Sequence, residues 1–398
     1  MMNKKKILLA FSGGLDTTFC AIYLSQEKNY EVHTAIVNTG GFSEEELSET
    51  KKRAYDLGVK SHQILDATSD YYQQCVKYMI YGNCLRNRNY PLSVSSERTF
   101  QSIALVNHAK AHQFSAIAHG STAAGNDQVR FDLTIRVLAP EMEVVTPIRD
   151  LKLSREEEID YLRKCGIEPE TKSTVYSINK GLWGTSIGGK ETLTSHQELP
   201  DSVFPGGTPD DGTEVVEIGF EKGEPVSLNG SKYDPVRIIS ELEDMGSQFA
   251  IGRDVHVGDT IIGIKGRVGF SAPAAKILIE AHLALEKHVL TRWQLHWKEQ
   301  IGSWYGMFVH EAQFLEPVMR DLEAFLTSSQ ERVTGIVKLR LRPYHFSVMG
   351  VESDFDLMDL KVAAYGEENK DWSAADVDGF TSILANQQKI WTSKSKSG

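Results

Sequence analysis

The feature that most constrains this fold is a short apolar run followed at once by a glycine turn and a helix. Residues 7–11 (ILLAF) are all apolar, which is typical of a strand covered on both faces of a sheet. Ser12, Gly13 and Gly14 form a turn, and apolar residues then recur at helical spacing from position 15 to position 23. This order of strand, turn and helix predicts an α/β fold with an anion-binding loop.

Strand-like and helix-like segments continue to alternate up to about residue 166. The expected strands are residues 32–37, 63–65 and 115–118, and the expected helices are residues 43–57, 97–112 and 154–166. Such alternation predicts a parallel sheet with helices on both faces. Ligands of these sheets bind beyond the carboxyl ends of the strands, where the turns after Phe11 and after Ala118 both lie.

The character of the chain changes near Glu168, where we place a domain boundary. The next two hundred residues mix Gly/Pro loops and strand-like runs with long helices, as in an α+β domain. Long helices are expected near residues 274–300 and 310–326, and paired strands at residues 333–349. The final amphipathic stretch is too short to fold alone, so we expect it to pack on a neighbouring subunit. The predicted division is 1–168, 169–368 and a C-terminal helical arm, 369–398.

Composition narrows the class of partner and the compartment. The formal net charge of −11 argues against nucleic acid, whose phosphates require a basic surface. We see no apolar segment near the ~20 residues that span a bilayer. Four cysteines stand far apart without CxxC spacing, which argues against zinc or disulfide frameworks and suits a reducing cytosol. We therefore expect a cytoplasmic protein with neither nucleic-acid nor membrane partners.

The loop at residues 10–18 (AFSGGLDTT) carries the strongest chemical signal. Its glycines allow the backbone N–H groups to approach a polyphosphate, and the helix that follows adds its positive end. Ser12, Thr17 and Thr18 can donate hydroxyl groups, whereas Asp16 is better suited to hold Mg²⁺ or to orient the loop. A tight turn with Ser12 or Asp16 as its helix cap is the structural alternative.

A second glycine-rich segment comes close to a P-loop but fails at one position. Residues 184–190 (GTSIGGK) end in a lysine, yet Glu191 stands where Ser or Thr must bind Mg²⁺. The loop at residues 10–18 has no such lysine. Transfer of the γ-phosphate is therefore not the expected chemistry.

Two motifs resemble a known family. SGGLDT at residues 12–17 resembles the loop of the N-type ATP pyrophosphatases, which cleave ATP between the α- and β-phosphates. Residues 119–132 (HGSTAAGNDQVRFD) resemble the HGxTxxGNDQVRFE signature of argininosuccinate synthase, with Asp132 for the final Glu. Residues 89–95, 176–186 and 262–267 are similar to further segments of that family.

The resemblance implies an adenine nucleotide α-hydrolase-like domain followed by a synthetase domain. It also implies a homotetramer that uses ATP and Mg²⁺ to join citrulline and aspartate in arginine biosynthesis. ATP would contact Ala10, Phe11, Ser12, Gly13, Gly14, Leu15, Asp16, Thr17, Thr18, Val37 and Gly120, with Asp16 also serving Mg²⁺. Aspartate would contact Thr122, Asn126 and Asp127, and citrulline would contact Tyr90, Ser95, Asn126, Arg130, Ser177 and Ser186. Asp16, Asp127 and Arg130 would carry the catalysis.

Three positions depart from the family pattern, all at the amino-acid end of citrulline. They are Val94, Gly258 and Phe270. Acidic residues such as Asp254, Asp259 or Glu280 would then hold the ammonium group, or the substrate is an N-acylated citrulline. A non-enzymatic ATP-binding module is the alternative from another class, and pyrophosphate release distinguishes it from an enzyme. A tRNA-modifying or glutamine-dependent relative is disfavoured, because the chain has neither a basic face nor an N-terminal nucleophilic cysteine.

Overall fold

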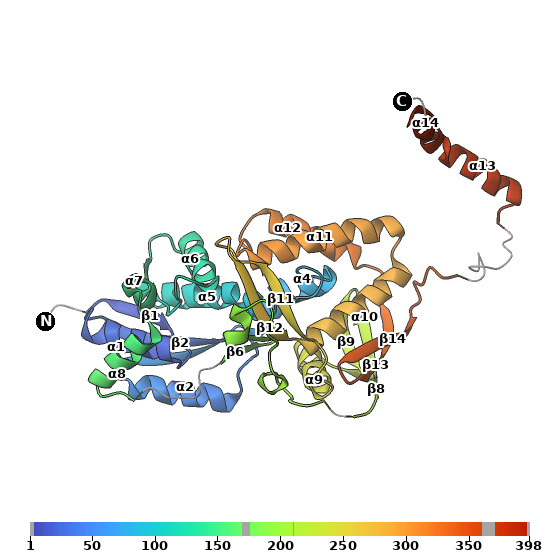
Figure 1. Cartoon of the computed structure of the whole chain (residues 1–398). Coiled ribbons are helices and arrows are strands. Elements are labelled where there is room, and N and C mark those ends of the chain that lie inside the picture. Colours follow the sequence, from blue (N-terminus) through green and yellow to red (C-terminus); the bar gives the residue numbers. More distant parts are fainter. Residues whose placement is uncertain (1–3, 169–175, 210, 360–370, 396–398) are drawn as a thin grey trace.

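A parallel sheet forms the N-terminal part of the protein (Figure 1). The computed structural model describes residues 4–168, 176–209, 211–359 and 371–395. The sheet has the order β3-β2-β1-β4-β5, and every neighbouring pair in it is parallel. Its strands are β1 Lys6–Ala10, β2 Glu31–Asn38, β3 Ser61–Asp66, β4 Ala116–Ala118 and β5 Glu143–Val145. The predicted α/β sheet is therefore confirmed.

Helices cover both faces of this sheet, as the apolar run of β1 predicts. Ile7 and Leu9 pack with α1 (Leu15–Gln26), α2 (Glu44–Asp56), α7 (Pro147–Leu151) and α8 (Arg155–Lys164) on one face. Leu8 points to the other face, towards α5 (Ser93–Ala111) and α6 (Asp127–Leu138). Successive side chains of a strand alternate between faces, so a fully apolar strand is one that is buried on both sides.

The helices predicted for the N-terminal half are present, with one boundary corrected. Capping boxes at Ser43 and Ser154 start α2 and α8, as the Ser-x-x-Glu spacing predicts. Helix α5 begins at Ser93, one turn before the expected start near residue 97. Its N-cap is Leu92, which has a left-handed φ of 66° and offers no side-chain cap, so no familiar start signal marks the position.

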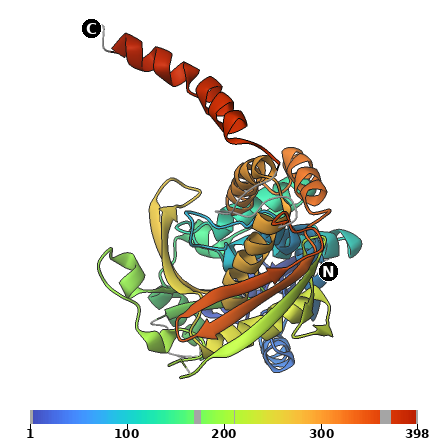
Figure 2. The same cartoon turned by 90° about the vertical axis from the view of Figure 1, so that its right-hand side faces the viewer.

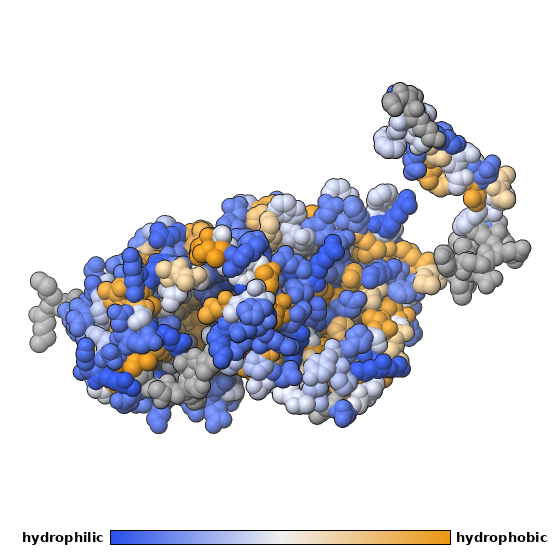
Figure 3. Space-filling view, in the orientation of Figure 1, coloured by the Kyte–Doolittle hydropathy of each residue, from blue (hydrophilic) through white to orange (hydrophobic). Residues whose placement is uncertain are grey.

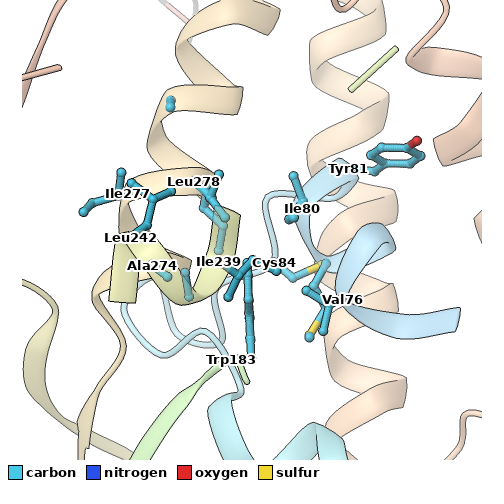
Figure 4. Close-up of a cluster of buried hydrophobic side chains, with 14 of the residues drawn as sticks. Val76, Ile80, Tyr81, Cys84, Trp183, Ile239, Leu242, Ala274, Ile277 and Leu278 are labelled. Atoms are coloured by element: carbon cyan, nitrogen blue, oxygen red, sulfur yellow. The ribbon is translucent and has the colours of Figure 1, made fainter. Parts of the chain in front are cut away.

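One segment of the N-terminal half packs into the core of the C-terminal half. It comprises α3 (Thr68–Tyr71), the π-helical turn η1 (Tyr72–Val76) and α4 (Lys77–Tyr81). Val76 and Ile80 lie beside Trp183, which precedes β7, and beside side chains of α9 and α10 (Figure 4). The two halves therefore share one large apolar cluster. The predicted domain boundary at residue 168 falls next to residues 169–175, which lie outside the described ranges.

The C-terminal half contains two antiparallel sheets. One has the order β10-β9-β8-β13-β14, and the other, which reaches the site, has the order β11-β12-β7-β6. The strands are β6 Tyr176–Gly181, β7 Gly184–Gly189, β8 Glu214–Glu221, β9 Glu224–Leu228, β10 Ser231–Lys232, β11 Arg253–Asp259, β12 Lys265–Ser271, β13 Gly335–Arg342 and β14 His345–Glu352. Strands β13 and β14 confirm the predicted pair at residues 333–349. Two 3₁₀ turns, η2 (Lys190–Leu193) and η3 (Asp201–Val203), connect β7 to β8.

Four helices complete this half, and two of them occupy a stretch where the sequence predicted a single helix. They are α9 (Pro235–Gln248), α10 (Pro273–Val289), α11 (Arg292–His310) and α12 (Val318–Ser329). The helix expected at residues 274–300 breaks because Thr291 and Gln294 form a capping box that starts α11. The helix expected from residue 310 begins eight residues later, at Val318.

Two final helices stand away from the rest of the molecule (Figures 1 and 2). They are α13 (Ala374–Leu384) and α14 (Asn386–Ser395). Their apolar side chains are open to solvent, with Ile383 73% and Trp391 72% exposed. Figure 3 shows hydrophobic residues among polar ones along them. We refer to residues 371–395 as the arm.

Two further observations bear on the expectations from composition. Within the described ranges, no helix has the length and apolar character needed to cross a membrane. All four cysteines are free, and Cys20, Cys75 and Cys84 are buried.

Candidate active site

A cleft of about 1050 Å³ lies between the parallel sheet and the four-stranded sheet. It opens at the carboxyl ends of β1, β2 and β4, where an α/β sheet binds its ligands. Of the predicted site residues, all except Gly13 and Thr18 line it. From the first half these are Ala10, Phe11, Ser12, Gly14, Leu15, Asp16, Thr17, Val37, Tyr90, Ser95, Gly120, Thr122, Asn126, Asp127 and Arg130, and from the second half Ser177 and Ser186.

The loop between β1 and α1 presents backbone and hydroxyl groups to the cleft. Gly13 has a φ of 78°, a conformation that favours glycine, and Gly14 is the N-cap of α1. The hydroxyl of Thr17 donates to the Gly14 carbonyl at 3.3 Å, which ties the turn to the helix. Gly13 faces α2, with Arg53 and Thr50 the nearest side chains, and Thr18 is 1% exposed beneath the loop.

Asp16 belongs to a pair of carboxyl groups at the start of α1. Burial raises its pKa, and the guanidinium of Arg155 offsets part of that increase. Burial and the neighbouring Asp16 together raise the pKa of Glu158 to about 8. The pair therefore holds a proton at neutral pH. Gly120 lies against the same turn, since a Cβ there would stand 3.2 Å from the Cβ of Asp16.

Asp127 connects two arginines at the centre of the cleft. Its carboxylate accepts from Arg98 Nε and from Arg130 Nη1, each at 3.0 Å. Burial acts to raise the pKa of Asp127, but the two guanidiniums hold it below its usual value. The side chain is still 43% exposed, which leaves room for a further donor from a ligand.

Arg98 was not among the residues predicted from the sequence. It lies one helical turn after Ser95 on α5, and its Nη2 also donates to Asn179 Oδ1 of β6 at 3.2 Å. A ligand-binding helix carries neighbouring side chains at three-residue spacing, and this spacing was the available signal. Arg98 therefore joins the first half of the chain to the strand that carries Ser177.

The remaining polar groups bring distant segments together. Asn126 Oδ1 accepts from the Ile261 amide at 2.9 Å, which connects the loop before α6 to the turn after β11. The Tyr90 hydroxyl donates to Ser95 Oγ at 3.4 Å. Ser177 and Ser186 lie on the paired strands β6 and β7.

The inner end of the cleft contains two histidines that sequence reasoning missed, His256 on β11 and His310 at the end of α11. The rings of His256 and Tyr90 stack with centroids 4.8 Å apart. A Cβ at Gly258 would stand only 2.5 Å from His256 Nε2. Both positions point to one face of β11, so the imidazole occupies the space beside the glycine.

The structure places the other positions that depart from the family pattern. Phe270 is fully buried and does not line the cleft, and the centroid of its ring lies 5.2 Å from that of Tyr90. Val94 does line the cleft. Of the three acidic residues considered for the ammonium group, only Asp259 lines the cleft, and Lys265 pairs with it at 2.6 Å. Asp254 accepts from Asn89, and Glu280 is exposed on α10.

Family comparison agrees with the architecture. The Arginosuccinate synthase N-terminal HUP domain matches residues 6–168, and the Arginosuccinate synthase C-terminal domain matches residues 176–391. The chain belongs to the argininosuccinate synthase family. It is 37% identical over 400 residues to the argininosuccinate synthase of Dictyoglomus thermophilum, covering 99% of each chain. It is also 37% identical over 367 residues to that of Methanocaldococcus jannaschii, covering 92% of each chain.

Membership of the argininosuccinate synthase family confirms the resemblance drawn from the motifs. The family motif at residues 119–132 runs from the end of β4 into α6 and forms the wall that carries Asn126, Asp127 and Arg130. The near match to a P-loop at residues 184–190 is mostly strand β7, which pairs with β6 and β12. The argininosuccinate synthase family is one of ATP-dependent ligases, and the chain is an enzyme of that class.

Proposed function

We propose that the chain joins citrulline and aspartate into argininosuccinate and converts ATP to AMP and pyrophosphate. One observation carries this proposal. A single cleft brings together the glycine loop after β1, the Asp127–Arg98–Arg130 group and the two serines of β6 and β7. A site that activates one substrate and then joins it to another needs these three regions around one reacting centre.

In the first step the ureido oxygen of citrulline attacks the α-phosphorus of ATP. The bond to the β-phosphate breaks, and pyrophosphate leaves. Backbone N–H groups of residues 12–14 and the N-terminus of α1 stabilise the negative charge of the phosphates. The chemistry requires no covalent nucleophile from the protein, because ATP itself is the electrophile.

Mg²⁺ fits this loop only with help from the nucleotide. The searched residues contain no group of three or more His, Cys, Asp or Glu side chains that could hold a metal. Asp16 would therefore supply a single carboxylate, and phosphate oxygens of ATP would supply other ligands, as is common for Mg²⁺ in nucleotide sites. Bound there, Mg²⁺ neutralises charge on the triphosphate.

In the second step the α-amine of aspartate attacks the activated ureido carbon, and AMP departs with the former ureido oxygen. Asp127 has an exposed edge that can accept from this amine and orient it. Arg130 is 3% exposed and held in place by Asp127 and by the His310 carbonyl, which suits it to bind a substrate carboxylate.

Measurement of AMP and pyrophosphate release, with each substrate omitted in turn, tests this function. We expect release only when ATP, a ureido substrate and aspartate are all present over many turnovers. Asp16→Asn should abolish it, whereas Asp56→Asn, in the last turn of α2, should leave it unchanged. Binding of ATP without any pyrophosphate release would instead indicate a non-enzymatic ATP-binding module.

We further propose a cytoplasmic homotetramer in which the arm contacts a neighbouring subunit. The exposed apolar side chains of the arm support this assembly, because isolated helices with such faces require a partner surface. The four free cysteines support a reducing compartment. The division into residues 1–168, 169–368 and 369–398 stays a prediction.

A further inference from the structure

The inner end of the cleft is a group of buried basic side chains with unused nitrogen atoms. His310 is 5% exposed and lines the cleft, and neither of its ring nitrogens has a hydrogen-bond partner in the part of the chain that the structure describes. Nε of Arg130, which also lines the cleft, and Nε of Arg86, which lies outside its lining, likewise have no partner there. With His256, these side chains form what we call the basic end. Buried donors without acceptors are costly, so a site that retains several of them is suited to a ligand that supplies acceptors.

The carboxylates around the basic end already have cationic or amide partners. Asp127 is held by two arginines, and Glu311 lies 3.7 Å from Arg86. Asp259 pairs with Lys265, and Asp254 accepts from Asn89. These four carboxylates are therefore already engaged before a ligand binds.

The guanidinium groups beside these two histidines disfavour an ammonium group. Burial first, and then the charges of Arg130 and Arg86, lower the pKa of His310 to about 3. Burial and the charge of Arg86 likewise lower the pKa of His256 to about 4. The burial and the positive field of the guanidinium groups that oppose protonation of these imidazoles also oppose the binding of a substrate cation beside them.

We propose that the basic end binds a carboxylate carried by an acyl group on the α-nitrogen of citrulline. Acylation makes this nitrogen neutral, so no cation enters the positive field. The acyl carboxylate supplies acceptors for His310 and for Nε of Arg130, which both line the cleft. The product is then the correspondingly acylated argininosuccinate. This inference rests on the proposed function, because it adds one group to the same ureido substrate and leaves both reaction steps unchanged.

Three substrates separate the two features of this ligand. Citrulline has a cationic α-nitrogen, N-acetylcitrulline has a neutral one, and N-succinylcitrulline adds a carboxylate. We expect kcat/KM to increase in that order, with N-succinylcitrulline at least about tenfold better than citrulline. His310→Gln should lower kcat/KM for N-succinylcitrulline by about ten- to a hundredfold more than it lowers that for citrulline. His345→Gln, at an exposed position, is the matched control.

Calorimetric binding of the same compounds in the presence of ATP distinguishes the two ways in which the account can fail. Tightest binding of N-succinylcitrulline without pyrophosphate release would support the basic end and overturn the proposed function. Efficient turnover of citrulline, with weaker binding and turnover of N-succinylcitrulline, would overturn the inference and leave the proposed function intact. An equal loss for all three substrates in His310→Gln would also overturn it.

Discussion

The imidazole of His256 occupies the space that a side chain at Gly258 would need. A Cβ at residue 258 would lie 2.5 Å from Nε2 of His256, and the ring is held there by its stacking on Tyr90. The glycine and the histidine are therefore one packing unit. This relationship explains in physical terms why a residue at the substrate end of the cleft has no side chain.

Substitution of Gly258 by alanine should destabilise the protein by about 1–3 kcal/mol, because the added methyl group overpacks a buried contact. Removing the ring in the double variant His256→Ala/Gly258→Ala should recover part of that loss. Urea unfolding of both single variants and the double variant gives the coupling energy. Gly350→Ala is the control, since a Cβ there meets nothing within 4 Å. Equal stability of the two glycine variants would refute the contact.

Asp127→Asn should separate the two steps of the reaction. Exchange of labelled pyrophosphate into ATP, with the ureido substrate present and aspartate absent, should persist, because the first step does not need the aspartate amine. Net product formation should decrease by about a hundredfold or more, since a charged hydrogen bond to that amine is lost. Glu141→Gln, on the surface, controls for expression and folding. Loss of exchange together with product would place Asp127 in the first step instead.

Two glutamates should each contribute less to the free energy of unfolding as the pH increases from about 4.5 to about 8. The pKa of Glu158 and that of Glu243 are each raised to about 8 from an ordinary value of 4.5, mainly by burial. At these two positions the folded protein therefore holds protons that the unfolded chain has released in this window, so their contribution to stability declines with increasing pH. Glu158→Gln and Glu243→Gln should each remove about one proton from the difference in bound protons between the folded and unfolded states. The dependence of the free energy of unfolding on pH should become less negative in each variant.

Only one of these two variants should change ATP binding. Above pH 8, ionised Glu158 places a second negative charge beside Asp16 and the phosphate loop, so the KM for ATP should increase. Glu158→Gln should abolish this increase. Glu243 accepts from the Ala274 amide, and its replacement in Glu243→Gln should leave the increase in KM unchanged. If the KM for ATP changed with pH in the same way in both variants, the Asp16–Glu158 pair would have no effect on ATP binding.

Deletion of residues 371–398 should reduce the size of the assembly and leave each subunit folded. The described residues of the arm contribute no buried side chain, whereas residues such as Phe380 and Trp391 expose large apolar groups. Sedimentation velocity measures the assembly, and circular dichroism checks the fold. Trp391→Asp should act like the deletion, and Lys389→Ala should not. An unchanged sedimentation coefficient after deletion would exclude the arm from assembly.

The sequence predicts elements whose signals are local. The apolar run of β1 and the capping boxes of α2 and α8 each act within a few residues, and each is found where it was expected. Strand β5 was missed because it has three residues and contains Glu143. The break before α11 was missed because continuous helical periodicity hid the cap at Thr291.

The residues of the site likewise fall into those that the sequence predicts and those that only the structure reveals. Residues of the glycine loop and of the segment around Asp127 lie within continuous motifs, and the cleft brings them together. His256, His310 and Arg98 come from other segments, and they become neighbours of the site only through β11, α11 and α5. Their role depends on distances and on unused hydrogen bonds, which periodicity and motif spacing do not contain.

Transfer of the ureido oxygen tests the central claim most directly. If that oxygen attacks the α-phosphorus and later leaves with AMP, then ¹⁸O in the ureido group of the substrate must appear in AMP. Mass spectrometry of AMP after complete turnover with ATP, aspartate and labelled ureido substrate measures this. We predict one ¹⁸O atom per AMP and unlabelled pyrophosphate. Unlabelled AMP, with ¹⁸O retained in the ureido compound or released to water, would contradict formation of the adenylate.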